Sequence, residues 1–265
     1  MATRIMGIIN VTPDSFSDGG QCFGVENAVA QADVLVADGA DLLDIGGEST
    51  RPFALPVSEE EEIQRVVPAI RAIRQKYSLP LSIDTTKAEV ARQALLAGAD
   101  MINDISALRH DPAMIDVVVA SDVPVVIMHM QGTPQDMQVE PRYQDVVGEI
   151  LDFFRERLDW LRGRGVDCRR IILDPGIGFG KTLTHNLILL KNLSAFSVLG
   201  QPILLGHSRK RFLGEITGRQ VAAERDLATA VVSALAVEQG VAIVRVHDVD
   251  ASRQAIRISE AIAAV

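Results

Sequence analysis

The chain has 265 residues, of which 48% are hydrophobic and 23% are charged, an ordinary mixture for a globular protein. With 26 Lys and Arg against 35 Asp and Glu, the formal charge is −9, which argues against a nucleic-acid or anionic-membrane partner because both need a basic face. No apolar run is long enough to span a membrane, and two cysteines cannot form a disulfide framework. The N terminus has no signal-peptide pattern, so we expect a cytoplasmic protein that binds neither nucleic acid nor membrane.

Short apolar runs recur along the chain, and an amphipathic stretch follows each of them. The runs are rich in Ile, Val and Leu, as is typical of parallel strands that are buried on both faces. We predict strands at 5–11, 41–45, 79–83, 100–102, 124–128, 171–173, 202–205 and 242–246.

The stretches between these runs have the periodicity of helices. Two begin with the pattern of a capping box, Ser58 with Glu61 and Thr86 with Glu89, and Gly98 is placed to end the second. Including the helices that follow these two boxes, we predict helices at 25–38, 58–73, 86–98, 112–120, 143–164, 185–193, 222–239 and 251–263.

Strand and helix therefore alternate eight times, which predicts a single α/β domain over residues 1–265 with the architecture of a (β/α)₈ TIM barrel. An open doubly wound sheet is the alternative. The polar segments 10–20 and 46–52 follow the first two strands as long loops, and we expect them to lie over the mouth of the barrel.

Polar side chains stand at or near the end of every apolar run. Chemistry in such barrels gathers at the C-terminal ends of the strands, so we expect these side chains to converge on one cavity. Alternatively they only form turns, because Asn, Asp and Gly are turn formers, although Arg245 and Lys210 are not. The residues at the strand ends are Asn10, Gly46, Gly47, Glu48, Asp84, Asn103, Asp104, His129, Asp174, Gly206, His207, Arg245 and His247.

Two groups of these residues have side chains suited to ligands. Arg245 and His247 alternate in an extended segment, so both can face one anion. Asp84, Asn103 and Asp174 carry short donors and acceptors that can pair with the edge of a ring, although Asp84 and Asp174 are also placed to cap helices.

The glycine-rich run at 176–182, GIGFGKT, looks like a phosphate-binding loop but matches neither nucleotide pattern. Pro175 stands where the Walker motif needs glycine, and Lys181 stands at the third glycine of the dinucleotide fingerprint. The run can bring backbone and Lys181 close to a flat or anionic ligand, or it can simply form a tight turn. The five histidines do not have metal-ligand spacing.

Several motifs in chain order resemble those of the dihydropteroate synthase family and span nearly the whole chain. They are MGIINVTPDSFSDGG (6–20), DIGGESTRP (44–52), SIDTTK (82–87), MINDIS (101–106), DPGIGFGK (174–181), SRKRF (208–212) and RVHDV (245–249). The resemblance implies a (β/α)₈ barrel, a homodimer, a requirement for Mg²⁺ and competition by sulfonamides. It also implies that (7,8-dihydropterin-6-yl)methyl diphosphate and 4-aminobenzoate are joined to give 7,8-dihydropteroate and diphosphate, a step of folate synthesis.

By position, the resemblance assigns a role to each matching residue. The pterin set is Asp84, Asn103, Asp174 and Lys210. The diphosphate set is Asn10, Arg245 and His247, with Asn10 also near the magnesium. The aminobenzoate set is Phe16, Thr50, Arg51, Pro52 and Phe179. The residues expected to act in catalysis are Asp18, Asp84, Lys210, Arg245 and His247.

The implied chemistry is a dissociative substitution, in which an anion leaves and positive charge spreads into the pterin. Arg245 and His247 would stabilise the anion, while Asp84 and Asp18 would stabilise the cation. Two other functions are a pterin-binding methyltransferase with a corrinoid partner and a non-catalytic paralogue. The first has no use for both loop signatures or for the Arg245–His247 pair, and the intact loops also argue against the second.

The substrates are anions although the chain is acidic. We expect the charge to be uneven, with Glu59–Glu62 outside the site and a basic mouth formed by Arg51, Lys181, Arg209, Lys210, Arg211 and Arg245.

Overall fold

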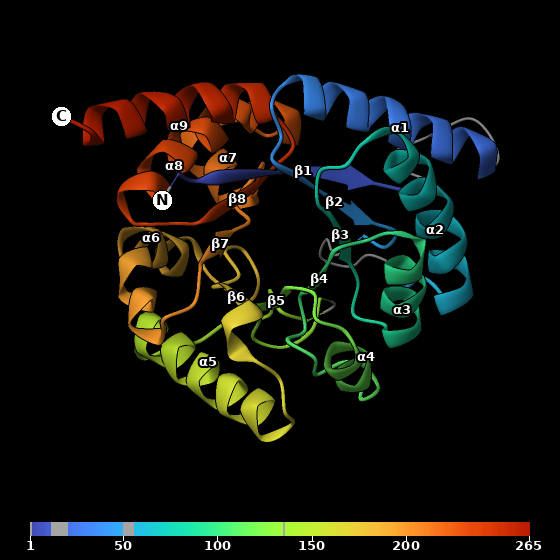
Figure 1. Cartoon of the computed structure of the whole chain (residues 1–265). Helices are drawn as coiled ribbons and strands as arrows, with labels where there is room; N and C mark the ends of the chain where they lie inside the picture. The colour runs from blue at the N-terminus through green and yellow to red at the C-terminus, as the bar shows by residue number, and fades with distance from the viewer. Residues whose placement is uncertain (1, 12–20, 50–55, 135) are drawn as a thin grey trace.

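The computed structural model describes residues 2–11, 21–49, 56–134 and 136–265. Its strands are all parallel and are hydrogen-bonded in the order β6-β5-β4-β3-β2-β1-β8-β7. A parallel bridge between Leu173 and Ile203 joins the two ends of this order and closes the ring (Figure 1). The predicted (β/α)₈ barrel is therefore confirmed, and the open sheet is excluded. The single domain over residues 1–265 stays a prediction. The strands are β1 (Arg4–Asn10), β2 (Leu42–Gly46), β3 (Leu81–Asp84), β4 (Met101–Asp104), β5 (Val125–Met128), β6 (Ile171–Asp174), β7 (Leu204–Leu205) and β8 (Ile243–Val246).

Helices surround the barrel and lie close to their predicted positions. The short helix α7, which starts directly after Lys210, is not among the helices predicted from the periodicity. In the described residues, 3₁₀ helices lie at Cys168–Arg170, Leu193–Leu199 and Ala222–Arg225. The α-helices are α1 (Gln21–Ala37), α2 (Glu59–Lys76), α3 (Ala88–Ala97), α4 (Met114–Ala120), α5 (Val146–Gly163), α6 (Leu183–Lys191), α7 (Arg211–Thr217), α8 (Asp226–Glu238) and α9 (Val249–Ala263).

One of the two predicted helix caps is wrong. Ser58 caps α2, because its side chain accepts the Glu61 backbone N–H at 3.2 Å. The Thr86–Glu89 box does not form, and α3 begins after Lys87 instead. There the Asp111 carboxylate, from the loop before α4, accepts the Ala88 N–H at 2.7 Å and replaces the local cap.

The inside of the barrel is built in layers, because every second residue of each strand points inwards. One inward layer is an apolar cluster separate from the core between strands and helices. Two residues further along several of these strands, the inward position becomes polar, as in the steps from Leu42 to Asp44 and from Ile243 to Arg245. The polar residues therefore lie on an apolar floor at the C-terminal end of the barrel. The floor consists of Met6, Leu42, Met101, Val126, Ile172, Leu204 and Ile243.

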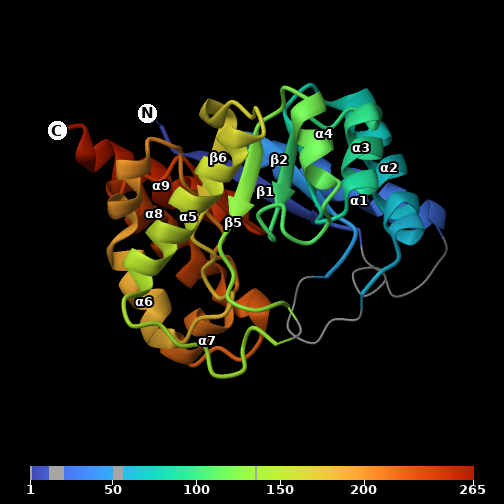
Figure 2. The ribbon, with the colours of Figure 1, turned by 90° about the horizontal axis from the view of Figure 1, so that it is seen from below.

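The C-terminal ends of the strands share one side of the molecule. In Figure 2, β5 points towards the side where α7 lies, and the segment after β5 also runs there.

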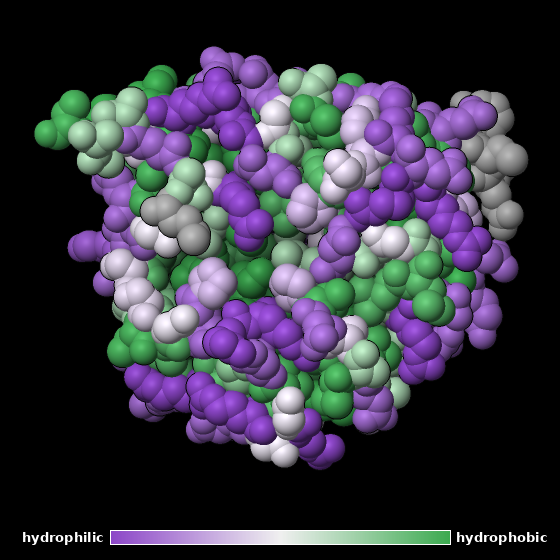
Figure 3. Space-filling model, viewed as in Figure 1, coloured by the Kyte–Doolittle hydropathy of each residue, from purple (hydrophilic) through white to green (hydrophobic). Residues whose placement is uncertain are grey.

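Figure 3 shows the face seen in Figure 1, on which hydrophilic side chains surround a hydrophobic centre. Among the described residues, no helix is both long and apolar enough to cross a bilayer.

Candidate active site

Arg245 on β8 is the centre of a polar cluster inside the barrel. Its Nε donates to Asp44 Oδ2 at 2.6 Å, and its Nη2 donates to Asp84 Oδ2 at 2.8 Å. Asn103 Nδ2 donates to the same Asp44 oxygen at 3.1 Å. Residues from β2, β3, β4 and β8 are thus tied together, and three of them are predicted site residues. The prediction that Asp84, Asn103 and Arg245 converge is borne out by these contacts.

Burial and charge act against each other on the ionisable groups of this cluster. Burial raises the pKa of Asp84 to about 7, although the Arg245 cation opposes the rise. The Asp44 carboxylate adds to that rise by repulsion. Burial lowers the pKa of Arg245, but Asp44 and Asp84 outweigh this effect and the net shift is upwards. Asp84 can therefore exchange a proton near neutral pH, while Arg245 stays charged.

Asp174 ends β6 and Lys210 follows β7, across the barrel from β2. Their opposite charges attract each other. The buried Asp174 carboxylate at the end of β6 accepts the Gly176 N–H at 2.8 Å, which makes a turn rather than a helix cap. Burial raises the pKa of Asp174, opposed by the Lys210 cation. Burial lowers the pKa of Lys210 to about 7, opposed by Asp174. These groups can present an acceptor and a donor to a planar heterocycle.

The glycine-rich run holds Lys210 in place. Lys210 Nζ donates to the Ile177 carbonyl and lies 4.2 Å from the ring centroid of Phe179, a cation–π contact. Gly178 has φ +82°, and a Cβ there would lie 2.8 Å from Lys210 Cδ. At Gly176, with φ +70°, a Cβ would lie 1.9 Å from the His129 carbonyl oxygen. The glycines thus form the tight turn that was the plainer interpretation, and this turn places Phe179 beside Lys210.

An apolar wall completes this half of the site. A small cluster of buried side chains, Ile105, Met128, Met130 and Met137, packs with Phe179. Ile105 and Met128 directly follow or end the neighbouring strands β4 and β5. Sequence analysis missed this wall, although the inward position of Met128 follows from its spacing of two residues after Val126. The wall offers a flat apolar surface next to the polar groups of Asp174 and Lys210.

Ser208 connects β7 and β8 at the mouth. Its hydroxyl lies 2.9 Å from His247 Nδ1 and accepts the His247 backbone N–H at 3.1 Å. Because that hydroxyl accepts one N–H, its own proton is available to the imidazole nitrogen. That His247 and Arg245, two residues apart, face one anion stays a prediction.

Several residues at the strand ends do not contribute to the cluster. His207 is buried against α8, with Nε2 2.9 Å from the Thr229 carbonyl and 3.1 Å from Ser233 Oγ. Asp104 accepts the backbone N–H groups of Ser106 and Leu108, at 2.7 and 3.1 Å, and so closes a turn. His207 therefore packs in the core and Asp104 forms a turn, and neither joins the cluster around Arg245.

The predicted basic mouth is smaller than expected. Arg209 pairs with Asp226 through two hydrogen bonds of 2.6 and 2.7 Å, and Arg211 pairs with Glu215 on the outside of α7. Lys181 is buried, and its Nζ contacts His129 Nδ1 at 3.1 Å and the Phe179 carbonyl at 2.9 Å. Burial and Lys210 lower the pKa of Lys181 well below its ordinary value. Its contacts place it inside the glycine-rich turn and not at the mouth. Of the six basic residues, the described mouth retains Lys210 and Arg245.

Glu48 belongs to a buried ionic group behind the mouth. Lys87 Nζ contacts Glu48 Oε2 at 2.6 Å and also pairs with Glu62 Oε2. Glu62 on α2 is fully buried, and its Oε1 has no partner among the described residues. Glu48 Oε1 also accepts the Val57 N–H at 3.0 Å, so it joins the two ends of the segment between β2 and α2. Glu48 is thus an anchor for this segment.

The structure does not test the roles predicted for the remaining site residues. Asn10 ends β1, is half-buried and pairs in register with Gly46 at the same end of the barrel. Asp18, Phe16, Thr50, Arg51 and Pro52 lie outside the described residues. The aminobenzoate set therefore stays a prediction apart from the position of Phe179.

Asp44 is the main site residue that sequence analysis did not select. It lies inside a predicted strand and not at its end, and attention to strand ends passed over it. The available signal was a charged residue two positions after Leu42, on the inward face of an otherwise apolar strand.

Replacing Lys87 by Met should destabilise the fold, because it leaves the Glu62 carboxylate buried without a cation. The expected loss in the free energy of unfolding is about 3–5 kcal/mol at neutral pH. It should be smaller in acid, where a protonated Glu62 needs no cation. Chemical denaturation at several pH values measures this, with Lys76→Met, an exposed lysine paired to Asp33, as control. Equal losses for the two variants would contradict the role of Lys87 in compensating the buried charge of Glu62.

Comparisons with known proteins agree over the whole length of the chain. Residues 6–247 match the family of pterin-binding enzymes. A dihydropteroate synthase of Synechocystis sp. is 47% identical over 260 residues, covering 98% of this chain and 90% of the relative. A Xanthomonas albilineans dihydropteroate synthase solved with 4-aminobenzoic acid has a TM-score of 0.94 at 49% identity, covering 100% and 94% of the two chains. The same organism's enzyme solved with 7,8-dihydropteroate has a TM-score of 0.91 at 46% identity, covering 100% and 95%. With its barrel, its polar ring and these relatives, the chain belongs to the pterin-binding enzymes and, within them, to the dihydropteroate synthases.

Proposed function

We propose that the cluster around Arg245 and the Asp174–Lys210 pair together form the site where this chain makes 7,8-dihydropteroate. The dihydropteroate synthase reaction joins (7,8-dihydropterin-6-yl)methyl diphosphate to 4-aminobenzoate and releases diphosphate. The observation that carries the proposal is the ring of inward-facing polar side chains above the apolar floor. It places a cation for an anionic leaving group next to carboxylates for a cationic ring.

The pterin would bind between the polar pair and the apolar wall. The Asp174 carboxylate would accept the ring N–H and amino donors, and Lys210 would face the ring acceptors. Asn103, with its amide held by Asp44, would complete the polar edge. The wall of Ile105 and Met128 would contact the ring face.

The diphosphate would bind at Arg245 and His247. Arg245 uses Nε and Nη2 for the two carboxylates, which leaves Nη1 without a partner among the described residues and suited to an anion. Among those residues, no three acidic, histidine or cysteine side chains are close enough to hold a metal, so Mg²⁺ would rely on the phosphates, water and Asn10. This donor set fits Mg²⁺, which keeps several waters and needs few protein ligands. When bound, Mg²⁺ would neutralise charge on the leaving diphosphate.

The reaction would proceed by departure before attack. The C–O bond to the diphosphate breaks, its electron pair stays on the leaving oxygen, and positive charge spreads from the methylene into the pterin. Arg245 stabilises the anion and Asp84 the cation within a low-dielectric interior. The amine nitrogen of 4-aminobenzoate then forms the C–N bond and loses a proton. Because the attacking amine is neutral, it needs no strong base. We propose that Asp18, from the first loop, helps to stabilise the cationic pterin.

The purified chain should convert the two substrates to 7,8-dihydropteroate in the presence of Mg²⁺, as detected by mass spectrometry. A chelator should abolish turnover, and added Mg²⁺ should restore it, because the leaving diphosphate would otherwise carry uncompensated charge. No product under conditions where an established synthase is active would overturn the proposed function. Methyl transfer from methyltetrahydrofolate to cobalamin would instead indicate the methyltransferase.

Replacing Arg245 by Ala should lower kcat/KM for the pterin diphosphate by about 100-fold or more, since it removes the anion contact and leaves two carboxylates without their cation. Steady-state kinetics measure the loss. Arg162→Ala, at an exposed arginine of α5 that pairs with Asp159, is the matched control and should stay within about twofold of the wild type. Unchanged activity in Arg245→Ala would refute the diphosphate assignment.

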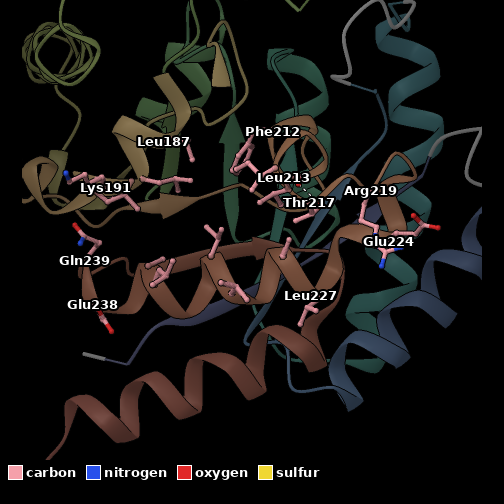
Figure 4. Close-up of a pocket in the computed structure, with 18 residues that line it drawn as sticks. Leu187, Lys191, Phe212, Leu213, Thr217, Arg219, Glu224, Leu227, Glu238 and Gln239 are labelled. Carbon is pink, nitrogen blue, oxygen red and sulfur yellow. Dashed lines mark hydrogen bonds between the residues drawn. The ribbon is translucent and has the colours of Figure 1, made fainter. Parts of the chain in front are cut away.

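We also propose a homodimer that uses an apolar face formed by α6, α7 and α8. A cavity of about 680 Å³ lies there, and Leu187, Phe212 and Leu213 are among its lining side chains (Figure 4). Along α8, Leu227, Val231 and Leu235 are four residues apart, and Leu227 is 78% exposed. Exposed apolar stripes of this kind are typical of interfaces, and a two-fold axis would pack the stripe against its own copy. We further propose that the protein is cytoplasmic and that sulfonamides bind at the aminobenzoate site.

The dimer is tested by Val231→Arg, which puts a charge into the middle of the apolar face. Light scattering after size-exclusion chromatography should give a dimer mass for the wild type and a monomer mass for the variant. Leu96→Arg, on the exposed side of α3, is the control and should stay dimeric. A monomeric wild type, or a Val231→Arg variant that remains dimeric, would contradict this interface.

A further inference from the structure

Asp44 stands apart from the other carboxylates of the site because it is completely buried. It lies in the middle of β2, and no part of its side chain reaches solvent. One of its oxygens, Oδ2, accepts both Arg245 Nε at 2.6 Å and Asn103 Nδ2 at 3.1 Å. The other oxygen, Oδ1, has no partner among the described residues. A buried charge of this kind is costly unless it is matched by a cation, and here Arg245 supplies the match.

The two contacts fix the orientation of two side chains that face the substrates. With Nε of Arg245 held by Asp44, the terminal nitrogen Nη2 of the guanidinium reaches Asp84. Holding Nδ2 of Asn103 decides which way its amide faces, since an amide whose NH₂ group donates to a carboxylate cannot turn over without losing that bond. One oxygen atom thus aligns a group proposed for the diphosphate with a group proposed for the pterin.

We propose that Asp44 is a positioning residue for the pterin diphosphate, which aims Arg245 and Asn103 at the two halves of this substrate without touching it. The inference rests on the proposed function and deepens it. It predicts a selective effect: changes at Asp44 act on the pterin diphosphate and spare the aminobenzoate, because neither Arg245 nor Asn103 belongs to the proposed aminobenzoate set.

Asp44 also acts on Asp84 through charge. Asp84 is in contact with Arg245 on β8, and the charges of Asp44 on β2, Asp104 on β4, Glu62 on α2 and Lys210 after β7 also act on it. Of these, the three carboxylates raise the pKa of Asp84, and Arg245 opposes them. An uncharged residue at position 44 removes one repulsion and leaves Arg245 with Asp84 as its remaining carboxylate. The pKa of Asp84 should then fall below the value of about 7 in the wild type.

The test compares Asp44→Asn and Asp44→Ala with the wild type and with a control. Asp44→Asn keeps the shape and an oxygen acceptor but loses the charge, whereas Asp44→Ala loses both. Ser82→Ala is the matched control, because Ser82 pairs in register with Asp44 on β3, is fully buried and has no hydrogen bond among the described residues. Circular dichroism and thermal melting establish that each variant is folded, and wild-type turnover, measured first, tests the proposed function separately.

In Asp44→Asn, kcat/KM for the pterin diphosphate should fall about 10- to 100-fold, the range expected for losing one charge-assisted hydrogen bond. The KM for aminobenzoate should stay within about twofold. The acidic limb of the kcat/KM profile should move to lower pH, because the ionised Asp84 forms more easily. Asp44→Ala should lose more activity than Asp44→Asn, and Ser82→Ala should match the wild type.

Two results would overturn the inference while leaving the proposed function intact. One is an active, folded Asp44→Asn variant with wild-type kcat/KM and an unmoved acidic limb. The other is an equal rise in KM for both substrates, which is what a general loosening of the barrel would produce. If Asp44→Ala does not fold, the Asp44→Asn kinetics and pH profile decide alone.

Discussion

Side chains alternate between the two faces of each strand, and the strands close into a barrel. This alternation is the constraint on which the rest of the structure depends. Every second residue of a strand points into the barrel, so the step from one inward side chain to the next is a step of two residues. Leu42 and Ile243 belong to the apolar floor, and Asp44 and Arg245 stand directly above them. The floor excludes water from below, and the polar layer then lies at the open end.

That position explains the electrostatics of the site. Carboxylates and cations are brought together where solvent cannot fully hydrate them, so burial is the largest influence on the pKa of both Asp84 and Lys210 and moves both to about 7. The Arg245 cation is shared between two carboxylates from different strands. A substrate that brings a diphosphate and a ring prone to positive charge offers opposite partners to both kinds of group.

Most of the fold could be predicted from the sequence, because eight short apolar runs alternating with amphipathic stretches allow few architectures. Periodicity did not predict the helix α7, since its seven residues make only about two turns and carry little periodic signal. Within the site, Asp84, Asn103, Asp174 and Arg245 were selected from their places at strand ends, and contacts with Asp44 and with one another bring Asp84, Asn103 and Arg245 together. His207 and Arg209 have the same places but different partners on α8, and only tertiary packing decides that His207 meets Thr229 and Arg209 meets Asp226. The cap of α3 failed for a similar reason, because Asp111 is distant in sequence.

The polar side chains above the apolar floor would bind the pterin diphosphate, with Arg245 in contact with both Asp44 and the anion. The most direct measurement is a crystal structure of the chain with Mg²⁺, diphosphate and a pterin. We expect the diphosphate at Arg245 and His247, the pterin edge at Asp174, and Arg245 Nε still bonded to Asp44. A diphosphate bound away from Arg245, or an Arg245 that leaves Asp44 to reach it, would contradict the account.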